Sequence, residues 1–162
     1  MVNIELNKQA KLSEHFTLGE LTKTSVKSLD GNIPSREVIE NLKRLCPWLE
    51  ELRARYNRMY VQGVQDNSEE PIIITSGYRS PDVNRAVGGA YSSNHLTGCA
   101  VDIRCAGVEQ AIRYAAILLD TADDTKEEYD ELLIERNRKG HYWVHFAVKP
   151  KDNRRKTMFI QA

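Results

Sequence analysis

The segment SSNHLTGCAVDIR, residues 92–104, combines a histidine and an aspartate with small residues between them. His95 and Asp102 are seven residues apart, and Gly98 and Ala100 lie between them. A histidine in a loop and an aspartate on the next strand can converge on one metal ion, because alternate residues of a strand share a face. The small residues would let the backbone turn closely around the ion. The segment therefore indicates a metal site, although Asp102 could instead cap a turn.

A third ligand is needed, because catalytic zinc commonly takes three protein ligands and leaves one position for water. His145 lies in the apolar run HYWVHFAV, where a histidine is more often a core residue than a ligand. The three cysteines, Cys46, Cys99 and Cys105, have no CxxC spacing. We expect them to be small buried side chains rather than disulfides or thiolate ligands, so nitrogen and oxygen must hold any metal.

The composition is that of one ordinary globular domain. The chain has 162 residues, of which 41% are hydrophobic and 28% charged, and this size suits a single core. Lys+Arg and Asp+Glu both number 23, so the net charge gives no argument for nucleic acid or an anionic membrane as a partner. No apolar run approaches the ~20 residues of a membrane span. The start lacks the apolar centre of a signal peptide, and we expect a monomer made in the cytoplasm.

The helices and strands that must position these residues follow from hydrophobic spacing. A helix is expected from a cap at Ser35 to about Tyr56, and Pro47 predicts a kink or two abutting helices. PIIITSGYR, residues 71–79, is typical of a buried strand, and SPDVNRAVGG, residues 80–89, of a short capped helix. An amphipathic helix follows, with an apolar face made of Val108, Ala111, Ile112, Ala115 and Leu119.

The two ends of the chain and the last strands complete this outline. YDELLIE and HYWVHFAV, residues 129–135 and 141–148, predict a β-hairpin. Residues 1 to about 34 are expected to form an N-terminal arm whose few apolar residues anchor it to the domain. Residues from about 149 to 162 are expected to form a basic, solvated tail. Residues 1–162 thus predict a single domain.

Residues 93–102, SNHLTGCAVD, match the pattern S-x-H-x-x-G-x-A-x-D, and the chain therefore resembles the zinc D-alanyl-D-alanine carboxypeptidase family. HFTLGELTKTS, SGYRSPDVNRAVGG and YDELLIE…WVHFAV resemble other segments of that family in the same order, so the resemblance covers most of residues 15–148. The family includes bacterial peptidases, phage cell-wall endopeptidases and relatives with a hedgehog-like fold. The resemblance implies an α+β fold, in which helices flank a central antiparallel sheet.

The resemblance also implies a Zn²⁺ ion held by His95, Asp102 and His145. The general base of the family is a glutamate just upstream of the last ligand. Glu135 is the candidate for this role, and Glu131 is its rival. Such a carboxylate would take a proton from water and pass one to the leaving amine.

Arg79 matches an arginine that the family directs at the substrate carbonyl, where a guanidinium would stabilise the oxyanion. Ser93 matches a serine that meets the substrate, although it could simply cap the loop. Some relatives carry a second histidine at the place of Trp143. His141 lies nearer the hairpin turn and could still bind the substrate as a hydrogen-bond donor. His15 has no motif around it and is expected to be structural.

By this resemblance the protein is a zinc peptidase that cleaves a peptidoglycan stem peptide next to D-alanine, as a D,D-carboxypeptidase or as an endopeptidase. The alternative is a non-catalytic module of the same fold that keeps its zinc and binds the cell wall or serves a phage structure. The presence of both Glu135 and Arg79 favours the enzyme. The expected partner is a peptidoglycan peptide, which the protein would meet at the wall after release by lysis or a phage system.

Overall fold

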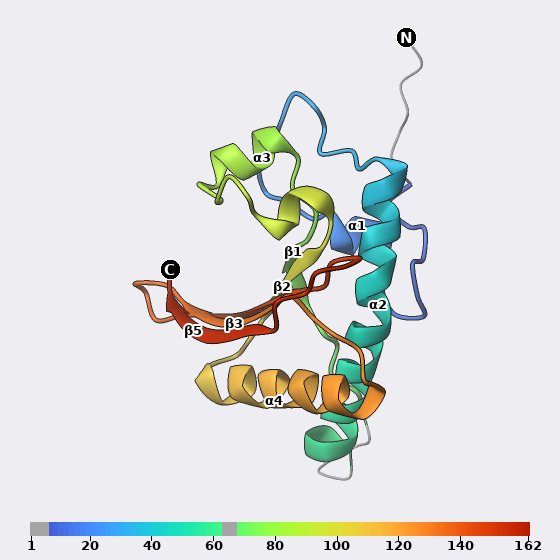
Figure 1. The fold of residues 1–162 in the computed structure, drawn as a ribbon, viewed down its shortest axis with the longest axis vertical. Helices are drawn as coiled ribbons and strands as arrows, with labels where there is room; N and C mark the ends of the chain where they lie inside the picture. Colours follow the sequence, from blue (N-terminus) through green and yellow to red (C-terminus); the bar gives the residue numbers. More distant parts are fainter. Residues whose placement is uncertain (1–6, 63–67) are drawn as a thin grey trace.

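The computed structural model describes residues 7–62 and 68–162, so the first six residues of the expected arm lie outside the described residues. A five-stranded sheet in the order β1-β2-β4-β3-β5 forms the centre of the molecule. One face of the sheet is covered by α4 (Val108–Thr125), and α3 (Pro81–Ala86) and the short helix η2 (Asn94–Thr97) lie over the other (Figure 1). The strands are β1 (Ile74–Ser76), β2 (Ala100–Arg104), β3 (Glu131–Arg136), β4 (Tyr142–Ala147) and β5 (Lys156–Gln161).

The register of the central strands decides which side chains can meet. β2 and β4 pair antiparallel with Asp102 opposite His145, and β4 pairs with β3 so that Leu133 lies opposite His145. Residues that lie opposite each other point to the same face of a sheet. The predicted hairpin is therefore confirmed, and it sets His145 on the same face as Asp102.

The C-terminal segment does not remain a solvated tail. Residues 156–161 form β5, which pairs in parallel with β3 and has Lys156 opposite Glu131. The sheet is therefore mixed rather than wholly antiparallel, while the α+β fold is confirmed. The free edge of β3 offers backbone hydrogen-bond partners, and the run TMFI has the side chains that strands favour. Most side chains of β5 are nevertheless exposed, including those of the apolar Met158 and Phe159.

The long helix α2 spans Arg36–Tyr56 without interruption, and a π-helical turn, η1 (Asn57–Val61), continues it. The Ser35 hydroxyl accepts a hydrogen bond from the Val38 amide, as the sequence predicts for a cap. Pro47 lies inside this one helix, so the expectation of two abutting helices is wrong. Residues on both sides of Pro47 are buried in the same core, which holds the two halves together: Leu42, Leu45, Trp48, Leu49 and Leu52.

The amphipathic helix α4 spans Val108–Thr125, and its buried face agrees with the predicted one only in part. Ala111 and Ala115 are buried as predicted. Val108 and Ile112 are 41% and 49% exposed. Tyr114 is buried and meets Tyr56 of α2 edge to face, with ring centroids 4.9 Å apart. The helix is turned so that this aromatic contact is buried, since a large ring removes more apolar area from water than Val108 or Ile112 would.

The N-terminal arm is anchored in the core, as expected. The short helix α1 (Leu18–Leu21) begins with a capping box between Thr17 and Glu20, and Phe16 and Leu21 are buried. Cys46 and Cys99 are buried and Cys105 is half-buried, and all three are free thiols, in agreement with the prediction. Across the described ranges, none of the helices combines the length and apolar character needed to cross a bilayer.

Candidate metal and catalytic site

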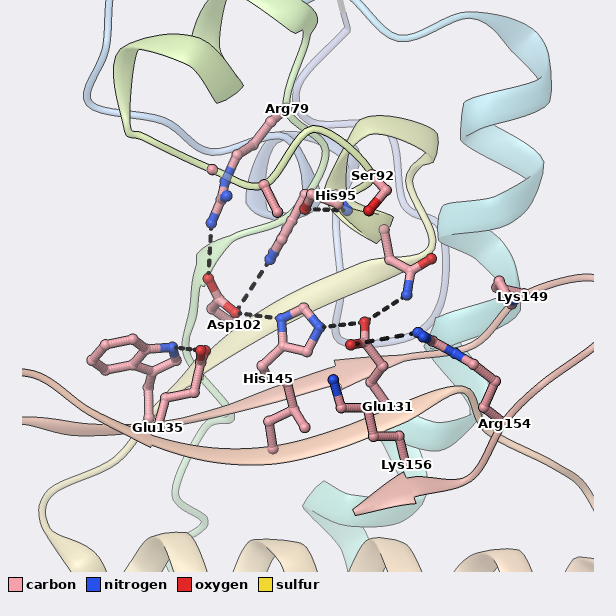
Figure 2. Close-up of a pocket in the computed structure, with 16 residues that line it drawn as sticks. Arg79, Ser92, His95, Asp102, Glu131, Glu135, His145, Lys149, Arg154 and Lys156 are labelled. Carbon is pink, nitrogen blue, oxygen red and sulfur yellow. Dashed lines mark hydrogen bonds and ion pairs between the residues drawn. The ribbon is translucent and has the colours of Figure 1, made fainter. Parts of the chain in front are cut away.

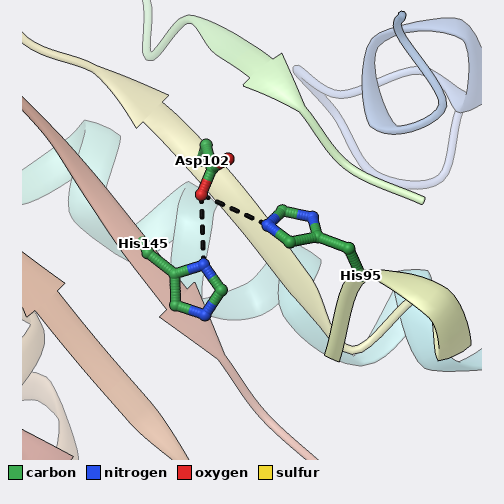
Figure 3. Close-up of side chains that lie close together, drawn as sticks. All are labelled: His95, Asp102 and His145. Atoms are coloured by element: carbon green, nitrogen blue, oxygen red, sulfur yellow. Dashed lines mark hydrogen bonds and ion pairs between the residues drawn. The ribbon is translucent and has the colours of Figure 1, made fainter. Parts of the chain in front are cut away.

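The three predicted ligands meet on the face of the sheet that is turned away from α4 (Figure 3). His95 lies in η2 (Asn94–Thr97), Asp102 in β2 and His145 in β4. Asp102 Oδ1 is 3.3 Å from His95 Nε2 and 3.1 Å from His145 Nδ1. All three residues are buried, and their ligand atoms lie within 4.8 Å of one another. His145 is therefore part of a polar cluster and not an isolated core histidine.

The outer ring nitrogens of both histidines have partners of their own. His95 Nδ1 lies 2.7 Å from the Gly77 carbonyl oxygen, and His145 Nε2 lies 3.2 Å from Glu131 Oε1. Because only an N–H can donate to these oxygens, the outer nitrogens carry protons. The inner nitrogens both face Asp102 Oδ1, where their lone pairs would face a metal ion once those nitrogens are deprotonated. Metal-binding histidines are held in this way in proteins. Two imidazole nitrogens and one carboxylate oxygen also form a donor set that suits zinc.

The loop that carries His95 is fixed by local contacts. The Ser93 hydroxyl accepts from the His95 amide at 3.2 Å and caps η2. Gly98 ends the turn with φ of 75°, and a Cβ there would lie 2.7 Å from the Val38 side chain. Gly98 thus allows η2 to approach α2, which differs from the expectation that it would wrap the backbone around the metal.

Arg79 reaches the ligand cluster from the loop before α3 (Pro81–Ala86). Its Nη2 lies 3.1 Å from Asp102 Oδ2, and its Nε donates to the Ser76 hydroxyl at 3.0 Å. Burial by itself would raise the pKa of the Asp102 carboxyl, but the charges and hydrogen bonds of His95 and His145 outweigh burial and hold the pKa below its usual value. Asp102 is therefore an anion with one oxygen held by Arg79 and the other facing the histidines.

Glu131 and Glu135 lie on the same face of β3 but in different surroundings (Figure 2). Glu131 Oε1 accepts from His145 Nε2 and, at 2.6 Å, from the Asn94 side-chain amide. Its Oε2 lies 3.6 Å from an Arg154 nitrogen. The hydrogen bond from His145 is the largest influence on Glu131 and keeps its pKa low against burial. Glu131 is thus occupied as the carboxylate that orients His145.

Glu135 has a single hydrogen-bond donor among the described residues. Trp143 Nε1 donates to Glu135 Oε2 at 2.6 Å, which leaves the other carboxylate oxygen free. Burial, followed by the negative charge of Asp102, raises the pKa of Glu135. A half-buried carboxylate with a free oxygen and a raised pKa has the properties of a general base. In the sequence, Trp143 stands out only as a departure from the family pattern. Its contact with Glu135 was not predicted.

A cleft of about 640 Å³ opens over these residues. Behind the wall formed by Asn94 and Arg154 lies the fully buried Asp130, which accepts from Asn94 at 2.9 Å and from Arg154 Nη2 at 2.7 Å. Asn94 precedes the predicted ligand His95, so Asp130 connects the loop that carries His95 to β3 and to the C-terminal segment. The sequence analysis missed this network. The polar pair Asp130-Glu131 at the start of a buried strand was the available signal.

The remaining predicted residues lie as follows. Ser93 lines the cleft, and its hydroxyl serves as the cap of η2. His141 lines a neighbouring hollow, together with Tyr142 and Trp143, rather than the main cleft, so its role toward substrate stays a prediction without a supporting contact. His15 does not line the cleft, and its Nδ1 lies 2.7 Å from Glu50 Oε2 on α2. This contact agrees with a structural role.

Comparison with known protein families identifies a match. The model of a family described as Peptidase M15 matches residues 14–131, well over half of the chain. The matched segment contains Arg79, His95 and Asp102 and ends at Glu131, so Glu135 and His145 lie beyond it. No curated protein matches the chain.

Proposed function

Because the chain belongs to the peptidase M15 family, whose members are zinc-dependent peptidases, we propose that it hydrolyses a peptide bond next to D-alanine in peptidoglycan stem peptides. Family membership indicates a metallopeptidase that acts on peptidoglycan-type substrates. The particular bond, and action as a D,D-carboxypeptidase or as an endopeptidase, are part of the proposal.

His95, Asp102 and His145 would hold the zinc ion. Their converging ligand atoms fit this ion, and the partners of the outer ring nitrogens support this ligand set, because they orient the two imidazoles. When bound, zinc acts as a Lewis acid and lowers the pKa of a water molecule. Glu131 contributes by keeping the His145 ring in place, which makes it a positioning residue.

Glu135 is proposed as the general base. Its free carboxylate oxygen would accept a proton from the attacking water and later deliver a proton to the leaving amine. Trp143 fixes the other oxygen by a 2.6 Å hydrogen bond and thereby sets the direction of the free one. The raised pKa of Glu135 favours both steps, because a base with a higher pKa accepts the proton more readily.

Arg79 is proposed to stabilise the negative charge that develops on the carbonyl oxygen. Its guanidinium lies at the cluster because Nη2 contacts Asp102, and Nη1 is held only by a long contact of 3.4 Å to Asn84. A planar guanidinium can keep the Asp102 contact with one nitrogen while another donates to substrate. The loss of such a donor typically costs a hundred- to thousandfold in turnover, roughly.

The observation that carries this proposal is a buried cluster of three possible metal ligands beside a carboxylate with one free oxygen. Digestion of purified peptidoglycan by the zinc-loaded protein, followed by mass spectrometry, tests it and identifies the bond. Glu135→Gln should abolish the products, and Glu128→Gln, which changes an exposed glutamate of the same region, should leave them unchanged. A zinc-loaded wild type that binds muropeptides and releases no product would instead favour the non-catalytic module.

That the protein reaches the wall after release by lysis or a phage system also remains a proposal.

A further inference from the structure

Three basic side chains line one wall of the cleft, on the side away from Arg79 (Figure 2): Lys149, Arg154 and Lys156. Two of them are ion-paired. Lys149 Nζ and Arg154 Nη2 lie 3.4 Å and 2.7 Å from the oxygens of the buried Asp130. Lys156 differs, because no carboxylate within residues 7–62 and 68–162 lies at ion-pair distance from its amine. Among the described residues, this wall thus contains one cation without an ion-pair partner.

The position of Lys156 in β5 turns it toward the cleft. Lys156 lies opposite Glu131 in the parallel pair of β5 and β3, so both side chains project from the same face. Figure 2 shows the Lys156 amine rising beside Glu131 and His145. The family match ends at Glu131, so this lysine belongs to a part of the chain outside the matched segment.

The strand spacing gives the reach of this amine. Neighbouring strands are about 4.8 Å apart, and β5 lies two strands from β4. The register sets Lys156 across from Ala147, two residues along the strand from His145. The backbones of Lys156 and His145 are therefore roughly 12 Å apart. One residue of an extended peptide spans at most about 3.6 Å. A substrate whose scissile carbonyl lies at the ligand cluster would therefore bring a group one or two residues away within reach of Lys156.

We propose that Lys156 binds a carboxylate of the substrate that lies within two residues of the scissile bond. The inference rests on the proposed function and narrows its substrates to acidic peptides. An ammonium group is a compact charge with three donors, which suits a carboxylate that approaches from solvent. Asp130 already pairs with Lys149 and Arg154, and Arg154 also lies 3.6 Å from Glu131. These two carboxylates therefore compete less strongly for the Lys156 amine.

The test is equilibrium binding, which does not require turnover. Stem peptides in which each carboxylate in turn is replaced by its amide are titrated calorimetrically into the zinc-loaded Glu135→Gln protein. At one position within two residues of the scissile bond, the acid should bind about three- to tenfold more tightly than the amide, as for a partly exposed charged hydrogen bond. Adding Lys156→Met should reduce this ratio to about one, and Lys156→Arg should retain most of it.

Lys151→Met is the matched control, because Lys151 is an exposed lysine of the same segment that does not line the cleft. It should leave the preference unchanged. A ratio that survives in Lys156→Met, an equal affinity of acid and amide at every position, or a lack of binding by all peptides would each overturn the role of Lys156. Failure of the proposed function is seen separately, as a lack of cleavage by the wild type.

Discussion

The two glutamates of β3 should separate metal binding from catalysis when each is changed to glutamine. Glu131 accepts a hydrogen bond from His145, whereas Glu135 contacts no predicted metal ligand by a hydrogen bond. Glutamine keeps the size of the side chain and an acceptor oxygen but removes the charge. Both variants should therefore fold. Glu131→Gln should lose zinc affinity, whereas Glu135→Gln should lose hydrolysis.

Glu131→Gln should weaken zinc binding. A charged acceptor makes a hydrogen bond roughly twice as strong as a neutral one, and loss of such an outer partner typically lowers metal affinity ten- to hundredfold, or about 1.4–2.7 kcal/mol. The 3.2 Å contact between His145 and Glu131 is of ordinary length, and Asn94 still donates to the glutamine oxygen. We therefore expect a value inside this range and near-normal hydrolysis at saturating zinc.

Glu135→Gln should show the reverse pattern. Zinc affinity should stay within about twofold of the wild type, while hydrolysis at saturating zinc falls about a hundred- to ten-thousandfold, because an amide cannot accept the proton of water. Competition with a chromophoric chelator measures the affinity, and the release of amine from a D-alanine-terminated peptide measures the hydrolysis. If Glu131→Gln is inactive with zinc saturated and Glu135→Gln turns over normally, the assignment of the two residues is reversed and the reasoning fails.

The remaining predictions concern the ligands, the arginine and the buried aspartate. The protein should bind one zinc ion per chain, and His95→Ala and His145→Ala should each lose it in elemental analysis; unchanged zinc would contradict the ligand set. Arg79→Ala should lower kcat more than it raises KM, with partial recovery in Arg79→Lys; a raised KM at constant kcat would point to ground-state binding instead. Asp130→Asn should lower the free energy of unfolding by about 2 kcal/mol in urea titrations at neutral pH. Burial opposes ionisation, but the Arg154 and Asn94 contacts hold the pKa of Asp130 far below its usual value. This stabilisation is therefore complete above about pH 4 and declines progressively as the pH falls toward the lowered pKa; a difference at pH 2 as large as that at neutral pH would be inconsistent with it.

Local patterns were enough to predict the metal loop. His95 and Asp102 lie within one short motif, and the turn between them depends on neighbours such as Gly98. His145 could be added only through the family resemblance, because an apolar strand with one histidine has no distinctive spacing. The structure brings it to Asp102 through the register of β2 and β4.

The roles of Glu131 and Lys156 could not be predicted, because each depends on pairings between distant segments. Glu131 became the partner of His145 through the register of the hairpin, and Lys156 reached the cleft only because β5 adds to the edge of β3. The buried face of α4 was misjudged for a similar reason. The small apolar residues of α4 gave little preference for which face of the helix is buried. The contact of Tyr114 with Tyr56 decided the rotation of the helix.

The buried Asp130 makes the mouth of the cleft and the end of the chain parts of one cooperative unit. Its oxygens accept from Asn94 in the metal loop and from Arg154 just before β5, while its own backbone carbonyl accepts from Lys156. Opening β5 would break these bonds and leave a buried carboxylate without most of its donors, so the loop that carries His95 would lose its anchor in the same event. Local unfolding at the C-terminus and release of the loop that carries His95 are therefore expected to share one opening free energy. The loop lies within the matched residues 14–131, whereas the C-terminal segment lies beyond them.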